Sequence, residues 1–412
     1  MRNCLSGKSN FGEKLMSIIK DYYDVIVIGA GPAGSVSARF AAENGASTLL
    51  LERDQGPGNP VRCAEGVSHN GIVPFIEIDP KWISTKIEQA RLYSPNGDYL
   101  DMFQNGTGYV LDRTLFDPAL ANLACQKGAQ LLTKADAIGL IYDNDKISGV
   151  KFRYFDKIYD VKCKIVIGAD GIESRVGRWA GIDTVLDLKD LDTCVQYTLT
   201  GLDISSLRVD FFFGREVAPG GYIWIFPKSK DTANVGIGIA GDLVTDKSPK
   251  EYLDEFIEKK FPNASVLRSV CGGVPTAKML KNPITDNLIL VGDAAHQVNP
   301  ITGGGIVQVM IAGQFAGETA AEAIKANNYS EKFLRKYIKK WNNRLGANQS
   351  FMYSVKEKFM RMDNERFNNL VKICSAIPSE KLTLKEFFKT IVKGDPMMIL
   401  QLAKAFVTSK LK

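Results

Sequence analysis

The sequence is poor in the residues from which metal sites and disulfide frameworks are built. It holds two histidines, His69 and His296, among 412 residues, which leaves little material for a histidine-based metal site. Its seven cysteines are dispersed and include no C-x-x-C pair, so we expect neither a disulfide framework nor zinc. We therefore expect a protein without a metal site.

Long apolar runs are missing as well. No stretch of about 18 apolar residues occurs, so no segment is expected to span a membrane. Residues 1–22 carry lysines but neither an apolar core nor a small-residue cleavage site, which argues against a secretory signal. We expect an N-terminal extension over 1–22 and a cytoplasmic protein.

What is present includes an uneven distribution of charge. Residues 321–412 contain 19 lysines and arginines against 8 acidic residues, whereas the residues before them contain 33 against 38. The ordinary interpretation is the solvated face of surface helices. Such a segment would also be attracted to an anionic membrane surface, where each basic residue contributes on the order of 1 kcal/mol. We expect no nucleic-acid partner.

Residues 23–52 have the pattern of a dinucleotide-binding unit. A β-branched apolar run over 23–29 predicts a buried parallel strand, and a glycine-rich turn and a helix follow it. The residues expected to form the turn are Gly29, Gly31, Ala33 and Gly34. The helix begins with free N–H groups that bind phosphates, and Glu52 ends the next strand, where its carboxylate can accept hydrogen bonds from a ribose. Because all these parts occur together, the prediction is specific.

A second region of cofactor contact is predicted over residues 288–306. An apolar run precedes Gly292 and Asp293, and a group of glycines then opens another helix. A ligand that reaches from the first glycine turn to this second helix N-terminus must be long, and this favours FAD over NAD. We therefore expect FAD as the cofactor.

These segments resemble the motifs of glutathione reductase-like flavoproteins, a group that includes the aromatic hydroxylases. Residues 288–306 are similar to the G-D motif of that group, and residues 166–175 to its D-G motif. By this resemblance, Asp293 would bond the ribityl hydroxyls, and two backbone N–H groups would face the flavin ring. The residues that the resemblance adds to the FAD site are Arg113, Ala137, Asp293, Gly305 and Ile306.

Residues 236–241 also spell G-x-G-x-x-G. They lie inside a segment in which small and apolar residues alternate, and no acidic strand end follows at the right distance. We interpret the segment as a β-strand that binds no nucleotide.

An aromatic motif occupies residues 219–227. On a β-strand, Tyr222, Trp224 and Phe226 project from one face and form an aromatic wall suited to a long apolar ligand. An ordinary sheet core has the same pattern. The motif resembles the Y-x-W-x-F-P signature of the geranylgeranyl reductase family, which implies a substrate-binding wall. A related W-x-W-x-I-P motif occurs in flavin halogenases, from which Tyr222 and Phe226 depart.

A cysteine-glycine loop follows the second predicted strand. Archaeal geranylgeranyl reductases carry a similar loop that contacts FAD, and the resemblance assigns Cys63, Ala64 and Gly66 to the cofactor site. A free cysteine is more often a small buried apolar side chain. Cys63, Tyr222 and a bound water all stay open as the proton donor.

The expected fold is α/β, or α+β overall. It combines a Rossmann-type FAD-binding domain of the glutathione reductase-like and aromatic hydroxylase type with an antiparallel substrate domain and C-terminal helices. The expected ranges are 23–90, 113–189 and 281–325 for the FAD-binding domain, 91–112 and 190–280 for the substrate domain, and 326–412 for the helical region.

The family resemblance implies a reductase that saturates geranylgeranyl chains of archaeal membrane glycerophospholipids at the inner face of the cell membrane. No second nucleotide unit is evident, so a ferredoxin, a reduced nicotinamide or a deazaflavin is an equally acceptable electron donor. An FAD-dependent aromatic monooxygenase or halogenase is the alternative. A flavin-binding protein without catalytic activity is a further one.

Overall fold

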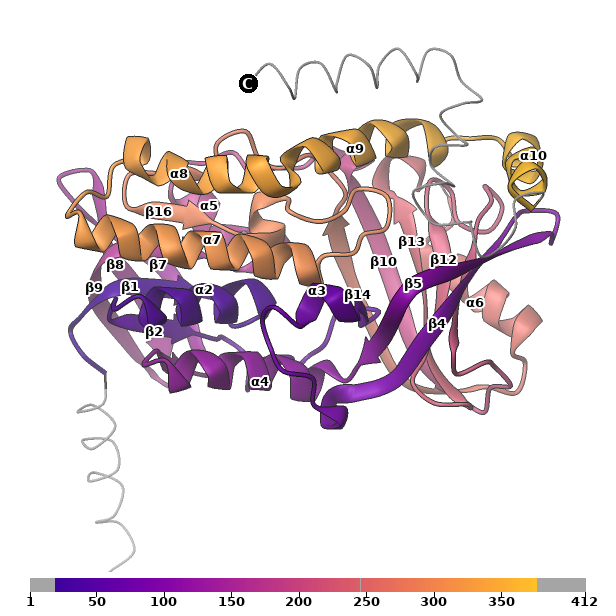
Figure 1. Cartoon of the computed structure of the whole chain (residues 1–412), viewed down its shortest axis with the longest axis horizontal. Helices are drawn as coiled ribbons and strands as arrows, with labels where there is room; N and C mark the ends of the chain where they lie inside the picture. The colour runs from indigo at the N-terminus through magenta and orange to yellow at the C-terminus, as the bar shows by residue number, and fades with distance from the viewer. Residues whose placement is uncertain (1–18, 245, 376–412) are drawn as a thin grey trace, which may run out of the picture.

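The computed structural model describes residues 19–244 and 246–375, and two eight-stranded sheets organise this part of the chain (Figure 1). The first sheet contains β15 (Ile284–Thr285), β16 (Leu288–Leu290), β9 (Lys157–Gly168), β1 (Tyr22–Ile28), β2 (Thr48–Leu51) and β6 (Gln130–Leu132), with β8 (Lys146–Tyr154) paired to β9 and β7 (Ala135–Asp143) paired to β8. The second contains β14 (Ser265–Pro275), β10 (Leu191–Thr200), β13 (Thr232–Ala240), β12 (Tyr222–Pro227), β11 (Arg208–Phe212), β4 (Ile83–Tyr93), β5 (Tyr99–Leu111) and β3 (Gly66–Ser68).

The first sheet has a parallel centre. Strand β1 pairs in parallel with β2 on one side and with β9 on the other. Its residues Val25, Ile26 and Val27 have no exposed surface, which is the environment that a continuous apolar run favours. The buried parallel strand predicted over 23–29 is therefore confirmed.

Helices cover the first sheet. They are α2 (Pro32–Glu43), α4 (Arg113–Gln126), α5 (Arg175–Trp179), α7 (Ile306–Lys325) and α8 (Glu331–Trp341). Helices α2 and α7 run side by side (Figure 1) and pack closely because α7 has glycines at the contact. A Cβ atom at Gly313 would collide with the carbonyl oxygen of Ala33, and one at Gly317 with that of Ser37.

The second sheet is antiparallel apart from the β11–β4 pair. One face packs on α6 (Pro249–Lys260), where Ile223, Ile225 and Leu253 are buried in one cluster. The opposite face carries the aromatic side chains of β12. Strand β4 begins at Ile83, so the second sheet draws on residues before the range 91–112, and the domain ranges stay a prediction.

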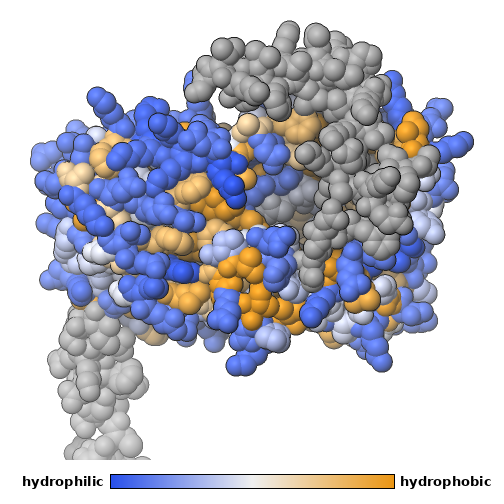
Figure 2. All heavy atoms as spheres, in the orientation of Figure 1, coloured by the Kyte–Doolittle hydropathy of each residue, from blue (hydrophilic) through white to orange (hydrophobic). Residues whose placement is uncertain are grey.

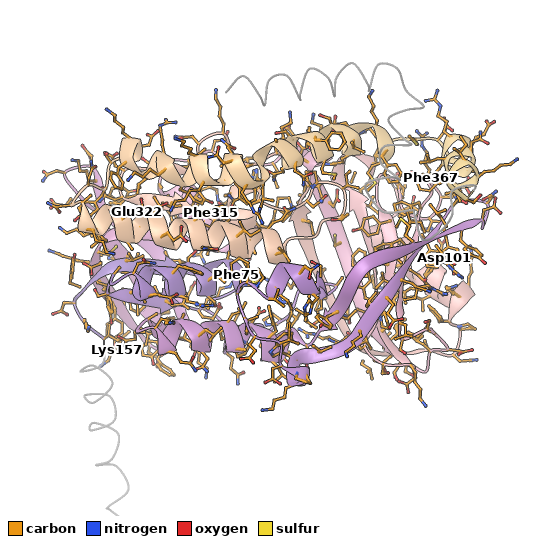
Figure 3. All side chains as sticks on the ribbon, viewed as in Figure 1. Phe75, Asp101, Lys157, Phe315, Glu322 and Phe367 are labelled. Atoms are coloured by element: carbon orange, nitrogen blue, oxygen red, sulfur yellow. The ribbon has the colours of Figure 1, made fainter. Side chains whose placement is uncertain are left out.

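Two further helices, α9 (Ala347–Phe359) and α10 (Asn364–Ser375), follow α8 through a short π-helical stretch, Asn342–Gly346. Helix α9 lies above the ends of β10 and β13 in Figure 1, and Phe367 of α10 packs against β5 (Figure 3). The remainder of the C-terminal helical region, 376–412, and residues 1–18 of the N-terminal extension lie outside the described residues.

Short elements complete the described chain. They are α3 (His69–Ile72) and the 3₁₀ turns Pro80–Trp82, Gly171–Glu173, Leu188–Asp190, Gly241–Leu243 and Gly292–Ala295. Within residues 19–244 and 246–375, no helix combines the length and the apolar character needed to cross a bilayer. Nor do the described histidine, cysteine and acidic side chains gather into a group of three suited to a metal ion.

Candidate active site

The first glycine turn has the geometry of a phosphate-binding turn. Gly29 has a φ of 98°, and a Cβ atom there would collide with the carbonyl oxygen of Ala169. A Cβ atom on Gly34 would collide with Gly29 itself, so the helix approaches the strand closely. The Cβ position of Gly31, in contrast, faces open space, and no side chain caps α2. The free N–H groups at this helix start therefore fit a pyrophosphate.

Glu52 lies beside this turn at the end of β2. One carboxylate oxygen accepts a hydrogen bond from the N–H of Ala30, and the other from the N–H of Asp54, each at 2.9 Å. Burial raises the pKa of the Glu52 carboxyl, against the effect of these two N–H groups. Ala137 lies on β7, two residues beyond Ala135, whose N–H donates to the Glu52 carbonyl oxygen at 2.8 Å. Both predicted residues thus lie at one corner of the sheet.

The second glycine turn contacts the first. Gly292 has a φ of 71°, and a Cβ atom there would lie 3.0 Å from that of Ala33. Asp293 follows, and burial raises the pKa of its carboxyl to about 6, opposed by the positive charge of Arg113. Gly305 precedes α7, which has no side-chain cap, so the N–H of Ile306 and its neighbours are free for a ligand. The structure thereby brings together two glycine turns that are far apart in the sequence.

The D-G motif lies against the second turn. The Ser174 hydroxyl donates to the Ala294 carbonyl oxygen at 3.2 Å, and the N–H of Val176 donates to Oδ2 of Asp170 at 2.9 Å. The other Asp170 oxygen, Oδ1, is buried and has no hydrogen-bond partner among the described residues. A buried oxygen without a partner is costly, so this site fits a ligand that supplies a hydroxyl group.

Cys63 lies where the loop that follows β2 meets the second sheet. Its thiol accepts a hydrogen bond from the N–H of Glu65 at 3.2 Å, and its carbonyl oxygen accepts one from Gln196 of β10 at 3.0 Å. The Arg113 guanidinium pairs with buried Asp117 at 2.6 Å. Burial lowers the pKa of Arg113, but Asp117 and Cys63 raise it by more. Cys63 and Arg113 are thus neighbours.

Glu65 holds this loop in place, a role that no pattern in the sequence indicates. It is 5% exposed and adopts a left-handed backbone conformation with a φ of 73°. One oxygen accepts from the N–H of Arg113 at 2.9 Å, and the other from Lys228 and Asn234, each at 2.7 Å. A single carboxylate therefore ties the loop of Cys63 to α4 and to the second sheet.

The aromatic wall is present. The ring centroids of Tyr222 and Trp224 are 6.0 Å apart, and Phe211 of β11 lies 5.6 Å from Phe226. The Trp224 indole N–H donates to Gln196 at 3.0 Å, and the Tyr222 hydroxyl donates to the carbonyl oxygen of Thr302 at 2.5 Å. Thr302 belongs to the loop that leads to α7, so the wall faces the second glycine turn.

Two glycines leave space for the aromatic rings of the wall. A Cβ atom on Gly66 would collide with the Phe226 ring, and one on Gly236 with the Trp224 ring. Gly236 lies on β13, which confirms the interpretation of the second G-x-G-x-x-G segment as a strand. Its glycines make space for an indole.

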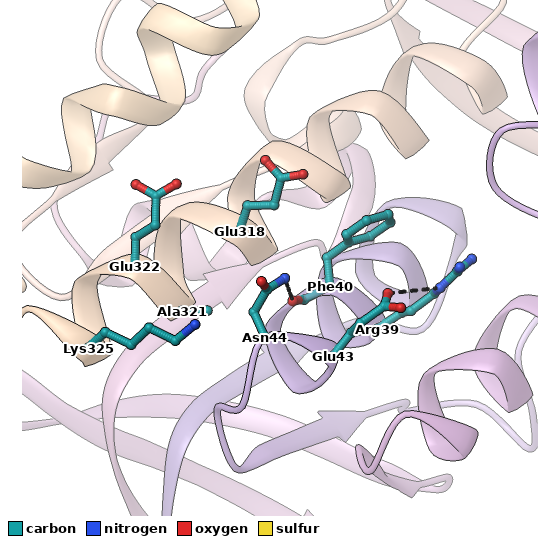
Figure 4. A pocket seen from close by; sticks show the side chains of 8 residues that line it. All are labelled: Arg39, Phe40, Glu43, Asn44, Glu318, Ala321, Glu322 and Lys325. Atoms are coloured by element: carbon teal, nitrogen blue, oxygen red, sulfur yellow. Dashed lines mark hydrogen bonds and ion pairs between the residues drawn. The ribbon is translucent and has the colours of Figure 1, made fainter.

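A separate polar pocket of about 460 Å³ opens on the surface between α2 and α7. Figure 4 shows Glu318 and Glu322 of α7 on one side and Arg39 and Glu43 of α2 on the other. None of the residues predicted for the cofactor or the substrate lines this pocket. It is therefore not the candidate active site.

Comparison with known proteins decides the family. A model of FAD-dependent oxidoreductases matches residues 24–200, and one of the geranylgeranyl reductase catalytic domain matches residues 190–274. Digeranylgeranylglycerophospholipid reductase 1 of Methanococcoides burtonii is 43% identical over 96% of this chain and 97% of its own. The corresponding reductase of Methanosarcina acetivorans is 44% identical over 94% and 97%. The chain belongs to the digeranylgeranylglycerophospholipid reductase family.

A solved structure agrees with this family. A geranylgeranyl bacteriochlorophyll reductase-like protein from Thermoplasma acidophilum has a TM-score of 0.89 and 36% identity, covering 93% of this chain and 99% of the other. A flavin-dependent brominase has a TM-score of 0.69 at 17% identity, covering 90% and 99%, and shares the fold alone. The protein is thus an FAD-dependent reductase, and the expected fold class and cofactor are confirmed.

Proposed function

We propose that this reductase saturates the double bonds of geranylgeranyl chains in archaeal membrane glycerophospholipids. The observation that carries the proposal is the aromatic wall, which faces the second glycine turn and is tied to it through Tyr222 and Thr302. Bound and reduced, FAD supplies the hydride equivalent for such a reduction. The chain's own residues bind the cofactor, orient the alkene and exclude water.

The residues that hold FAD in this proposal form three groups. The first glycine turn binds the pyrophosphate and Glu52 the ribose, while Asp293 bonds the ribityl chain. The N–H groups of Gly305 and Ile306 face the flavin ring. The loop that follows β2 and the start of α4 lie beside the ring and contribute Cys63, Ala64, Gly66 and Arg113. Ala137 lies near Glu52.

An isolated alkene has no carbonyl that could polarise it, so positioning in a dry cavity is the main contribution of the protein. The apolar cluster beside the wall would keep water away from the alkene. Phe213 lies 5.6 Å from Tyr222 and stacks on Phe367 of α10 at 5.0 Å. Phe359 and Met362 join them around a small pocket at the surface. We propose that the prenyl chain enters along this row of side chains.

A prenylated glycerophospholipid resides in a bilayer. We therefore propose that the protein docks on the inner face of the cell membrane. Figure 2 shows apolar side chains over the middle of one face, in the region of α3 and α4. Val73 and Leu115 in this region are 42% and 47% exposed. The basic residues of the C-terminal segment would add attraction to anionic lipids. For the electron donor, the prediction stays open between a ferredoxin, a reduced nicotinamide and a deazaflavin.

The test is a reaction with a defined lipid. The purified protein is reduced with dithionite under nitrogen, and a geranylgeranylated glycerophospholipid is added in detergent. We expect a bound-flavin spectrum, reoxidation of the flavin on addition of the lipid, and lipid masses that rise by two hydrogen atoms per double bond. A flavin that is reduced but leaves the lipid unchanged would contradict the proposal. Oxygen consumption stimulated by a phenol would instead favour the monooxygenase alternative.

A further inference from the structure

The proposed reaction needs a proton as well as a hydride equivalent, because one carbon of the alkene receives each. The Tyr222 hydroxyl lies on the aromatic wall, but its hydrogen is already donated to the Thr302 carbonyl oxygen. Burial, with smaller contributions from Asp192 and Cys194, raises the pKa of this phenol, so Tyr222 stays neutral. A neutral phenol can pass a proton on but needs a second group that reloads it.

A chain of hydrogen bonds leads from α9 to Asp192 of β10. Lys356 of α9 is 4% exposed, and its ammonium donates to the carbonyl oxygens of Lys189 and Thr276, each at 2.8 Å. It also donates to the Thr276 hydroxyl at 2.9 Å, and that hydroxyl donates to Oδ1 of Asp192 at 3.1 Å. Buried lysines are uncommon, and this one contacts Asp192 through a single threonine hydroxyl.

The outer end of the chain reaches the surface. Oδ1 of Asp190 lies 3.4 Å from the Lys356 ammonium, and Oδ2 accepts from the Tyr353 hydroxyl at 3.2 Å. The Asp190 side chain is 14% exposed, so water can reach it. Asp190, Lys356, Thr276 and Asp192 therefore form a continuous polar path between solvent and the interior.

The inner end of the chain lies on the same face of the sheet as the aromatic wall. Cys194 of β10 pairs with Gly238 of β13, and Gly238 pairs with Tyr222 of β12. Asp192 is two residues before Cys194 and points to the same side. A Cβ atom on Gly238 would lie 3.3 Å from the Cys194 sulfur and 4.0 Å from the Asp192 Cβ. One strand, β13, with Gly238 at the cross-strand position, lies between Cys194 and Tyr222.

The charge around Asp192 suits a group that gains and loses a proton near neutral pH. Burial raises the pKa of its carboxyl to about 6. Lys356 and the Thr276 hydroxyl oppose this shift, whereas the carboxylates of Asp190 and Asp242 add to it. Two further titratable groups, Cys194 and Tyr222, also interact with Asp192.

We propose that Asp192 stores the proton of the reduction and delivers it through the Tyr222 phenol, and that the Asp190–Lys356–Thr276 path reloads it. This rests on the proposed function. The carbon–carbon π bond breaks as one carbon gains the hydride equivalent of the reduced cofactor and the other gains the phenol proton. The phenol takes the proton of Asp192 and ends neutral, and the Asp192 carboxylate is reprotonated from solvent. Asp192 acts through Tyr222, so it is a positioning residue.

The first experiment compares Asp192→Asn with Asp192→Glu in the FAD-loaded protein. Single-turnover reoxidation of the reduced flavin by the prenyl lipid is followed across pH. In the wild type, the rate should fall as pH rises through about 6, because the carboxyl must be protonated. Asp192→Asn should slow reoxidation by roughly 100-fold and abolish this pH dependence. Asp192→Glu should restore both in part, and flavin content should not change.

A matched control is Asp254→Asn. Asp254 lies on α6 and accepts from Tyr197, which projects from the opposite face of β10. This variant should keep the wild-type rate and pH dependence. An Asp192→Asn protein that matches the wild type in rate and pH profile would overturn the proposal.

A second readout does not depend on turnover. Infrared difference spectra should show a protonated carboxyl band that titrates near pH 6 and is missing in Asp192→Asn. Lys356→Met should move this titration and the rate profile to higher pH, since the lysine charge lowers the pKa of Asp192. A band unaffected by both substitutions would also overturn the proposal. Failure of the proposed function is distinguishable, because the wild type itself would then leave the lipid unreduced.

Discussion

The Tyr222 hydroxyl and the Thr302 carbonyl oxygen are 2.5 Å apart, and this hydrogen bond joins the second sheet to the loop that leads into α7. Thr302 lies three residues before Gly305, whose N–H is among those assigned to the flavin ring. This polar contact links the aromatic wall to the cofactor turns, while the Tyr222 ring packs against Phe211, Phe213 and Trp224. The Tyr222 hydroxyl is thus the polar link between the wall and this loop.

Tyr222→Phe tests this contact. We expect the variant to fold and bind FAD, with a loss of about 1 kcal/mol in the free energy of unfolding for one hydrogen bond. Reduction of the lipid should slow by at least about tenfold, because the proton path and the wall are both altered. Thermal unfolding and single-turnover kinetics measure the two effects. Tyr197→Phe, on the other face of the same sheet, should leave turnover unchanged.

Gly31→Ala separates cofactor binding from folding. The Cβ position of Gly31 is open, and its backbone, with a φ of −67°, suits alanine. The flavin-free protein should therefore keep its melting temperature. A bound pyrophosphate needs the same space, so the dissociation constant for FAD should rise by at least about tenfold, or 1.4 kcal/mol. Gly139→Ala, at another open position, is the control. Equal FAD affinity in both variants would contradict the assignment of the turn.

The first glycine turn and Glu52 could be predicted from the sequence, because the patterns that indicate them are local. Gly29, Gly31, Gly34 and Glu52 lie within one strand–helix–strand unit, and each follows from a short-range requirement of backbone or ligand. The alternation around Trp224 likewise predicted which side chains share a face. Such patterns need no knowledge of distant partners.

The contacts that join the loop of Cys63 and helix α9 to the second sheet could not be predicted, because their partners are far apart in the sequence. Glu65 contacts Lys228 and Asn234, more than 160 residues away in the chain, and Lys356 contacts Thr276, 80 residues away. No sequence pattern marks a charged residue as buried before its partners are known. The start of β4 at Ile83 likewise depends on its pairing with β5 and β11.

Glu65→Gln tests the buried charge network. The substitution keeps the side chain's shape but leaves the Lys228 ammonium, which is 19% exposed, without its carboxylate. We expect the free energy of unfolding to fall by about 3 kcal/mol, measured by urea denaturation. The double variant Glu65→Gln with Lys228→Met should recover part of this loss. Glu331→Gln removes an exposed pair with Arg335 and should cost about 0.5 kcal/mol or less. Equal losses in the two single variants would contradict the network.

Asp293→Asn should stabilise the flavin-free protein at neutral pH while weakening its hold on FAD. Burial raises the pKa of the Asp293 carboxyl from 3.8 to about 6, so the folded chain binds the proton more tightly than the unfolded chain. Stability contributed by the protonated form is therefore lost as pH rises from about 4 to about 6.

The asparagine variant has no such dependence. At pH 7 it should unfold with a free energy about 3 kcal/mol higher than the wild type, and the difference should vanish near pH 4. Urea denaturation at both pH values measures this, and a difference independent of pH would contradict it. FAD affinity should fall in the same variant, because an amide replaces the carboxylate that accepts hydrogen bonds from the ribityl hydroxyls. Asp293 would then lower the stability of the flavin-free protein and raise its affinity for FAD. This combination is expected of a residue kept for binding and not for folding.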